Sequence, residues 1–243
     1  MKKIMIIAAM FATALFVNAQ DPQKTLKDAI MSGMLDNVKT AVETLHADVN
    51  KQFKDKAFDN FPLHDACFMY NPEIAVYLIE KGANVNSLNR FGATPLSMLC
   101  QTTIQDEAIT EKMITIINAL IAKQADLNIL SKGGYSALGY ATEHNNTKVA
   151  LLLLEKGADP NVRGGGKFTF TPLMYACKAG NFELVKALLA KGAKINEIRE
   201  TVQGNIVTTE NAASMASDGN FAEILQYLKD NGAKAPKGRK IWK

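Results

Sequence analysis

Apolar residues along the chain fall into short stripes that have helical spacing. Three clear stripes cover residues 74–79, 149–154 and 184–189, and the segments between them are polar and contain Gly and Asn. A helix of this length is marginal in water, because a stable isolated helix needs about 12 to 15 residues. The pattern therefore predicts several short helices that become stable only when neighbouring helices cover their apolar sides.

One short phrase that ends in Asn recurs after these stripes. It reads EKGANVN at Glu80–Asn86, EKGADPN at Glu155–Asn161 and AKGAKIN at Ala190–Asn196, with looser copies that end at Asn50 and Asn128. The final Asn residues are separated by 36, 42, 33 and 35 positions. A repeat of about 33 residues is typical of a solenoid built from stacked units.

A second phrase recurs between the copies of the first. It reads FPLHDAC at Phe61–Cys67, TPLSMLC at Thr94–Cys100, SALGYAT at Ser136–Thr142 and TPLMYAC at Thr171–Cys177. A Thr hydroxyl can cap a helix, and a Pro at the next position loses no hydrogen bond there. We therefore expect each copy to begin the first helix of a unit.

The Asn-ending phrase has the chemistry of a helix end. Gly82, Gly157, Gly192 and Gly232 can adopt the left-handed conformation that stops a helix. The Asn that follows can bond its own backbone and begin a turn. Each unit is thus expected to end a helix, reverse the chain and begin the next unit.

In these motifs the chain resembles the ankyrin repeat, over roughly Thr25–Ala233. The resemblance implies an all-α solenoid of stacked helix-turn-helix units joined by hairpin-like loops, with about six repeats including degraded caps. The units are expected near residues 25–58, 59–91, 92–132, 133–167, 168–205 and 206–233 of a domain that spans 20–233.

Two stretches depart from the repeat length. The third unit carries an insertion at Gln101–Lys112, which is expected to lengthen both helices or the turn between them. The stretches NVRGGGKFTFTPL and NEIRETVQGNIVTTE extend the loops between units. In the ankyrin family such loops are fingers beside a concave groove.

The first nineteen residues have the features of a secretory signal peptide. Lys2 and Lys3 precede an apolar run from Ile4 to Val17, and cleavage is expected after Ala19. The run is too short to span a bilayer, which takes about 20 residues. The segment predicts a periplasmic or secreted protein of bacterial type, and an uncleaved anchor is the alternative.

Composition agrees with a folded chain, since 47% of its residues are hydrophobic and 21% are charged. The net charge of +4 falls to +2 without the signal peptide, which gives no basis for binding nucleic acid or inserting stably into a membrane. The basic tail, residues 234–243, could contact an anionic surface or be solvated. We expect a monomer.

The cysteines occupy one repeat position, at Cys67, Cys100 and Cys177. Equivalent positions on stacked helices are about 8–10 Å apart, whereas a disulfide needs Cα atoms within about 7 Å. Three buried free thiols are therefore expected despite export. His64 stands in PLH, where the family's ring bonds the neighbouring loop, and His144 either faces the groove or is solvated.

No known catalytic motif fits the chain. GYSALG at Gly134–Gly139 has the wrong spacing for a nucleophile elbow, and GGGKFT at Gly164–Thr169 lacks the Ser or Thr of a phosphate loop. His46, His64 and His144 lie in different repeats without metal-ligand spacing. We predict no enzyme and no catalytic, cofactor-binding or metal-ligating residue.

The remaining candidate site is a protein-binding surface made of loop tips and first helices. Exposed aromatic residues and Arg carry much of the binding energy in interfaces. The loop candidates are Arg90, Phe91, Arg163 and Lys167, and the first-helix candidates are Phe68, Tyr140, Tyr175 and Lys178. Tyr140 and Tyr175 could instead pack between repeats.

The sequence thus predicts a non-catalytic module or scaffold of the periplasm or cell envelope that binds another protein through its concave face. One alternative is a redox-protective or stress-related exported factor that uses an exposed Cys. A second alternative is a host-directed effector.

Overall fold

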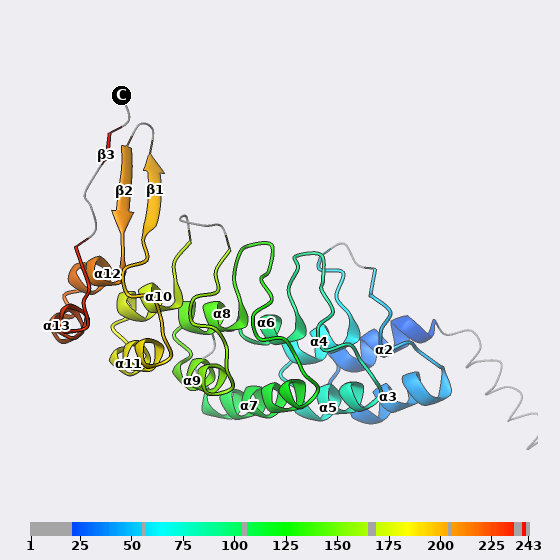
Figure 1. The fold of residues 1–243 in the computed structure, drawn as a ribbon. Coiled ribbons are helices and arrows are strands. Elements are labelled where there is room, and N and C mark those ends of the chain that lie inside the picture. The colour runs from blue at the N-terminus through cyan, green and yellow to red at the C-terminus, as the bar shows by residue number, and fades with distance from the viewer. Residues whose placement is uncertain are drawn as a thin grey trace, which may run out of the picture.

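The helices form a stack of six pairs with all inter-unit loops on one side (Figure 1). The computed structural model describes residues 21–54, 57–103, 106–164, 169–203, 206–235 and 240–241, so the expected signal peptide lies outside the described residues. The pairs are α2 (Pro22–Met31) with α3 (Leu35–Lys39) and the π-helical turn η1 (Thr40–Thr44), α4 (Pro62–Phe68) with α5 (Pro72–Glu80), α6 (Pro95–Leu99) with α7 (Glu107–Ala122), α8 (Ala137–Glu143) with α9 (Thr147–Glu155), α10 (Pro172–Lys178) with α11 (Phe182–Ala190), and α12 (Ala212–Asp218) with α13 (Ala222–Asp230). The all-α solenoid of about six units is confirmed.

The first helices begin as the second phrase predicts. The hydroxyls of Thr94, Ser136 and Thr171 accept hydrogen bonds from backbone N–H groups three residues later, at 3.0–3.2 Å. Phe61 is the exception, because it has no oxygen with which to cap α4. Capping is thus supplied locally in most units, while no side chain caps the start of α4.

The Asn that ends each unit acts differently from the prediction, because its side chain reaches the following unit. Its Oδ1 accepts a hydrogen bond at 2.7–2.9 Å from a backbone N–H of the following unit. The acceptors are Asn50, Asn86, Asn128, Asn161 and Asn196, and the donors are, in the same order, Asn84, Asp126, Asp159, Lys194 and Lys234. The side-chain amides of Asn50, Asn161 and Asn196 also donate to Gly82 O, Gly192 O and Gly232 O at 2.9–3.1 Å, and that of Asn86 donates to Gln124 O at 3.4 Å. We call these contacts the Asn clamps.

The unit's own turn is closed by the residue two positions earlier. The Oδ1 atoms of Asp48, Asn84, Asp126 and Asp159 accept from the backbone N–H of the Asn that ends the unit, at 2.8–2.9 Å. A short polar side chain forms this local turn readily. The final Asn is thereby left to bond across the repeat boundary.

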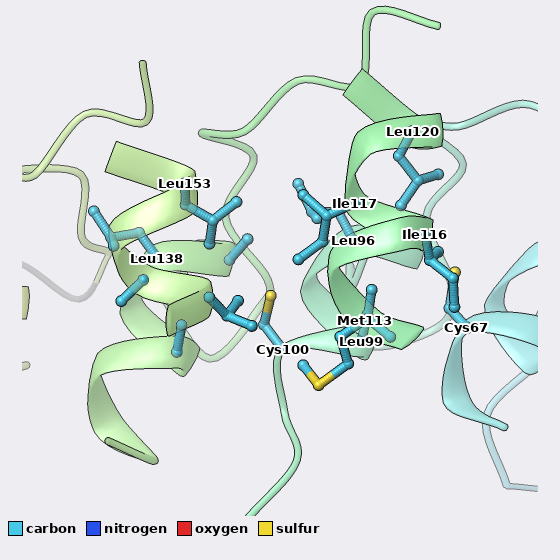
Figure 2. Close-up of a cluster of buried hydrophobic side chains, with 14 of the residues drawn as sticks. Cys67, Leu96, Leu99, Cys100, Met113, Ile116, Ile117, Leu120, Leu138 and Leu153 are labelled. Carbon is cyan, nitrogen blue, oxygen red and sulfur yellow. The ribbon is translucent and has the colours of Figure 1, made fainter. Parts of the chain in front are cut away.

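The core runs through the whole stack between the two rows of helices. Figure 2 shows Leu96 and Leu99 of α6 beside Ile116 and Ile117 of α7, and each of these side chains is at most 1% exposed. The same kind of packing buries Leu138 and Leu153 in the next unit. The apolar stripes are therefore covered by neighbouring helices, as the pattern predicts.

The insertion in the third unit lengthens only one of its helices. The second helix, α7, has 16 residues, whereas α5, α9 and α11 have nine each. The first helix, α6, has five residues, fewer than the seven of α4. Of the two alternatives, growth of both helices is not observed, whereas the link between α6 and α7 is longer than the link between α4 and α5, as the other alternative predicts, and α7 takes up the remaining residues.

The loop before the last unit is a β-hairpin rather than an irregular finger. Strands β1 (Arg199–Gln203) and β2 (Ile206–Glu210) pair antiparallel, and Arg199 Nη1 lies 2.6 Å from Glu210 Oε2. A short strand β3 (Lys240–Ile241) from the basic tail pairs with β2. Two residues of the tail are thus part of a sheet, an arrangement that differs from both contact with an anionic surface and a solvated tail.

The three cysteines are free and buried, which confirms the sequence prediction. Cys67 and Cys177 lie in α4 and α10, and Cys100 caps the end of α6 (Figure 2 shows Cys67 and Cys100). Burial raises the pKa of Cys100 and of Cys177 to about 12 and raises the pKa of Cys67 as well. The thiolate form is therefore scarce near neutral pH.

His64 bonds the neighbouring loop, as the family role predicts. Its Nε2 lies 2.8 Å from the carbonyl oxygen of Ala93, so the neutral ring donates there, and its Nδ1 has no hydrogen-bond partner. Phe61 stands where three other units have a Thr or Ser hydroxyl, with its ring centroid 5.7 Å from that of His64. Burial lowers the pKa of His64 to about 4.

We predict that Asn161→Ala lowers the free energy of unfolding by about 1–2 kcal/mol, because it removes two hydrogen bonds across a repeat boundary. Urea denaturation followed by circular dichroism measures the loss. Asn118→Ala is the control, since Asn118 is exposed on α7 and Ala favours a helix. Equal losses in both variants would contradict a role for the clamp.

We predict that His64 makes the fold less stable in acid. Its pKa is lowered on folding, so the unfolded chain binds the proton more readily. The stability that His64 contributes is complete above pH 6.5 and decreases by about 3 kcal/mol as the pH falls toward 4. Urea denaturation of the wild type and of His64→Gln at pH 7.5 and 4.5 measures the effect.

The variant should lose less stability than the wild type between the two pH values. All other ionisable groups are the same in both proteins, so the difference between the proteins isolates His64. Identical pH dependence would show that the buried ring does not control acid stability.

Candidate partner-binding surface

Backbone hydrogen bonds hold neighbouring loops in register. Arg90 N donates to Phe58 O at 3.2 Å, Lys132 N donates to Phe91 O at 2.8 Å, and Gly164 N donates to Gly134 O at 2.7 Å. The last pair is so close that a Cβ on Gly164 would lie 2.5 Å from the Cα of Gly134. The loop row in Figure 1 is therefore a connected surface rather than a set of independent fingers.

A hollow of about 280 Å³ opens in this surface between the second and fourth units. Its tips are the rings of Phe58 and Phe91, whose centroids are 5.8 Å apart in an edge-to-face arrangement. Met98 of α6 and Tyr140 of α8 line it, and Lys132 stands on its rim. We call this feature the aromatic hollow.

A cluster of tyrosines continues from the hollow toward the C-terminal units. The rings of Tyr135 and Tyr140 stack with centroids 4.9 Å apart, and Tyr140 Oη lies 3.0 Å from Ser131 Oγ. Tyr175 donates to Glu143 Oε1 at 2.9 Å and lies 3.0 Å from Tyr135 Oη, which therefore donates to it. Burial raises the pKa of Tyr140 and of Tyr175, so both hydroxyls stay protonated.

The predicted site residues divide into exposed and packed groups. Arg90 and Lys178 are exposed, and Phe68 and Phe91 are 50% and 48% exposed. The aromatic hollow includes Phe91 and Tyr140 but not Phe68 or Lys178.

Tyr175 lies apart from the exposed group, because it is buried at 8% exposure. Its hydroxyl bonds bridge α10 to α8, so it packs between repeats, which is the alternative reading of this residue. Tyr140 is half-buried and takes part in both the packing and the hollow.

The Arg163 side chain forms bonds within and between loops. Its guanidinium donates to Thr169 O at 2.6 Å and Ile198 O at 3.1 Å and pairs with Glu197 at 3.0 Å. It ties its own loop to the one that follows, and it is half-buried. Lys167 lies outside the described residues.

Sequence reasoning missed Phe58, Met98 and Lys132. The repeat register contains a signal for two of them, because Phe58 and Phe91 both stand three residues before a first-helix cap, and Lys132 and Arg90 both stand four before one. Met98 has no such signal, since its side chain belongs to the ordinary apolar pattern of α6.

The described residues offer little for catalysis. No group of three His, Cys, Asp or Glu side chains among them could hold a metal ion. No helix in the described part of the chain has the length and apolar character needed to cross a membrane. The chemistry of this face is that of contact, through aromatic rings and exposed cations.

Comparisons with known proteins agree with this architecture. The family model of ankyrin repeats in three copies matches residues 106–199, and the single ankyrin-repeat model matches residues 58–90. The B-cell lymphoma 3 protein homolog of mouse is 27% identical over 71% of this chain and 36% of its own length. A putative ankyrin repeat protein of fowlpox virus, FPV230, is 28% identical over 53% of this chain and 82% of its own length.

The rat ankyrin repeat and SAM domain-containing protein 6 is 33% identical over 49% of this chain and 13% of its own length. The matched part of this chain thus spans about a third or less of the length of the two mammalian relatives. These relatives come from animals and a virus, so they do not support the exported bacterial type that the N-terminal sequence suggests. The matched residues and the stacked helix pairs show that the chain belongs to the ankyrin-repeat family, a non-catalytic protein-interaction fold.

Proposed function

We propose that the protein is an exported interaction module that binds another protein through its loop tips and first helices. The observation that carries this proposal is the collection of exposed aromatic and cationic side chains on one connected surface, with Arg90, Phe91 and Lys178 among them. Such side chains contribute strongly to protein interfaces. The loops are already held in place, so binding costs little conformational entropy.

Export is part of the proposal and depends on the N-terminal sequence. Two lysines and a fourteen-residue apolar run precede a small-residue cleavage site, which is the pattern of a secretory signal. Cleavage after Ala19 would leave Gln20 as the first residue of a periplasmic or secreted chain. A host-directed effector would have to travel further, and fractionation of the producing cell separates these destinations.

The redox-protective alternative needs a reactive cysteine. All three thiols are buried, and burial raises their pKa values. Reactive cysteines are accessible and have a lowered pKa. The structure therefore favours the interaction module over thiol chemistry.

We predict that native protein reacts with a chromogenic disulfide reagent at least about a hundredfold more slowly than free cysteine at pH 7.5, because the thiols are inaccessible and protonated. Denaturation in urea should release three equivalents. Rapid reaction of one native thiol would support the redox alternative, and fewer than three equivalents would reveal a disulfide.

The binding proposal is tested with mature protein isolated from the periplasmic fraction and used as bait in a cross-linked envelope extract. Arg90→Glu combined with Lys178→Glu should reduce recovery of a specific partner at least about tenfold, which corresponds to about 1.4 kcal/mol. Arg163 is left unchanged because its bonds hold the loops.

Lys112→Glu combined with Lys123→Glu is the matched control, since both lysines are exposed in or beside α7. It makes the same change in net charge away from the proposed surface. Equal recovery with both double variants would overturn the assignment of this face. The N-terminus of the bait should be Gln20, and an intact Met1 would contradict signal cleavage.

A further inference from the structure

The aromatic hollow is suited in size to one side chain. Its volume is about 280 Å³, just below the range of about 300–1,000 Å³ that is typical of sites for whole small molecules. The hollow is open on one side, where the rings of Phe58 and Phe91 are 44% and 48% exposed. A chain that crosses the loop tips could therefore insert one residue while its backbone stays outside.

The lining selects a large apolar side chain. Phe58, Phe91 and Met98 present carbon and sulfur surfaces to the cavity. The hydroxyl of Tyr140 is already bonded to Ser131, so it has little need of a hydrogen bond from a ligand. Leu, Met or Phe would bury its side chain against these surfaces and leave the hydroxyl of Tyr140 paired with Ser131.

The rim selects negative charge beside that anchor. Lys132 is exposed and pairs with no described carboxylate, and the described residues that line the hollow include no Asp or Glu. Arg90 lies outside the lining, with its guanidinium carbon 5.5 Å from the centre of the Phe91 ring and its Nη1 donating to Ala57 O at 3.4 Å. A carboxylate one or two residues from the anchor would meet this positive rim.

The hollow is also preformed. Two backbone hydrogen bonds, from Arg90 N to Phe58 O and from Lys132 N to Phe91 O, fix the loops that bear its rings and its cation. Stacking on Tyr135 fixes the Tyr140 wall. A site held in this way binds without first ordering its own loops.

We propose that the aromatic hollow is the anchor site for an acidic peptide segment of the partner, which inserts one large apolar side chain and sets an adjacent carboxylate against Lys132. This inference rests on the proposed function and specifies the chemistry of the partner at that surface. The occupant is an unfolded or loop segment of another protein.

The test begins with a random twelve-residue peptide library displayed on phage and selected against the mature protein. Enriched sequences should share a Leu, Met or Phe with Asp or Glu within two positions. A synthetic, fluorescein-labelled copy of the most enriched peptide is then titrated by fluorescence anisotropy against the wild type and its variants.

Phe91→Ala should weaken binding at least tenfold because it opens one wall of the hollow. Lys132→Glu should weaken binding about fivefold or more, and raising NaCl from 50 to 500 mM should weaken wild-type binding more than binding by Lys132→Glu. Lys112→Glu, on the exposed side of α7, should leave the affinity unchanged. Circular dichroism at each step shows that the variants remain folded.

The two proposals fail in different ways. If the enriched peptide binds but Phe91→Ala and Lys132→Glu leave its affinity unchanged while Lys178→Glu weakens it, this face binds partners and the anchor site is wrong. If peptides of other composition are enriched, the acidic anchor is wrong.

If no peptide is enriched and the envelope bait recovers no partner that depends on this face, both proposals fail. Analytical ultracentrifugation of the protein alone tests whether a second copy of the chain occupies the hollow. A dimer that Phe91→Ala abolishes would mean that a second copy of the chain fills the hollow, which would also overturn the peptide assignment.

Discussion

Hydrogen bonding across the repeat boundary is the constraint on which this structure depends. Each unit has two short helices that cannot persist alone, and apolar contact by itself would allow neighbouring units to slide or rotate. The Asn clamps remove that freedom, because one amide accepts from a specific backbone N–H of the next turn and, at four boundaries, donates to a specific carbonyl there. Burial supplies the free energy of stacking, and the clamps set its register.

The position of the loops follows from that register. With the helices fixed from unit to unit, neighbouring loops meet closely enough to share backbone hydrogen bonds at Phe58, Phe91 and Gly134. The aromatic hollow exists because the side chains of one repeat position are brought beside those of the next. A partner therefore meets a surface whose spacing is set by the Asn clamps between the units.

The recurring part of the fold could be predicted from sequence, and the variable part could not. Thr94 and Thr171 cap helices and His64 bonds the next loop, because each role needs one residue type at one position. The partner of Asn161 was missed, because periodicity shows that a residue recurs but not whether its side chain bonds its own turn or the next. The length of α7 was only half foreseen, since an insertion can enter either helix or the link between them.

The same reasoning explains the candidate site. Arg90 and Phe91 lie on the surface because the loop register puts them there, whereas Tyr175 is buried by contacts with Tyr135 and Glu143 that come from other units. Whether an aromatic residue faces solvent depends on neighbours about 33 positions away. Aligning the repeats finds Lys132, but only packing shows that Tyr175 is covered.

Burial of the thiols bears on the proposed export as well as on the core. Oxidising compartments convert accessible cysteine pairs into disulfides, so an exported chain with three free cysteines needs a reason to keep them reduced. Each thiol lies in a different unit within a buried apolar stripe, and its pKa is raised by that burial. Disulfide exchange requires a thiolate that can reach its target, and stacking removes both the charge and the access. The stack that forms the binding surface would therefore also protect the cysteines, provided that the chain folds before its thiols are oxidised.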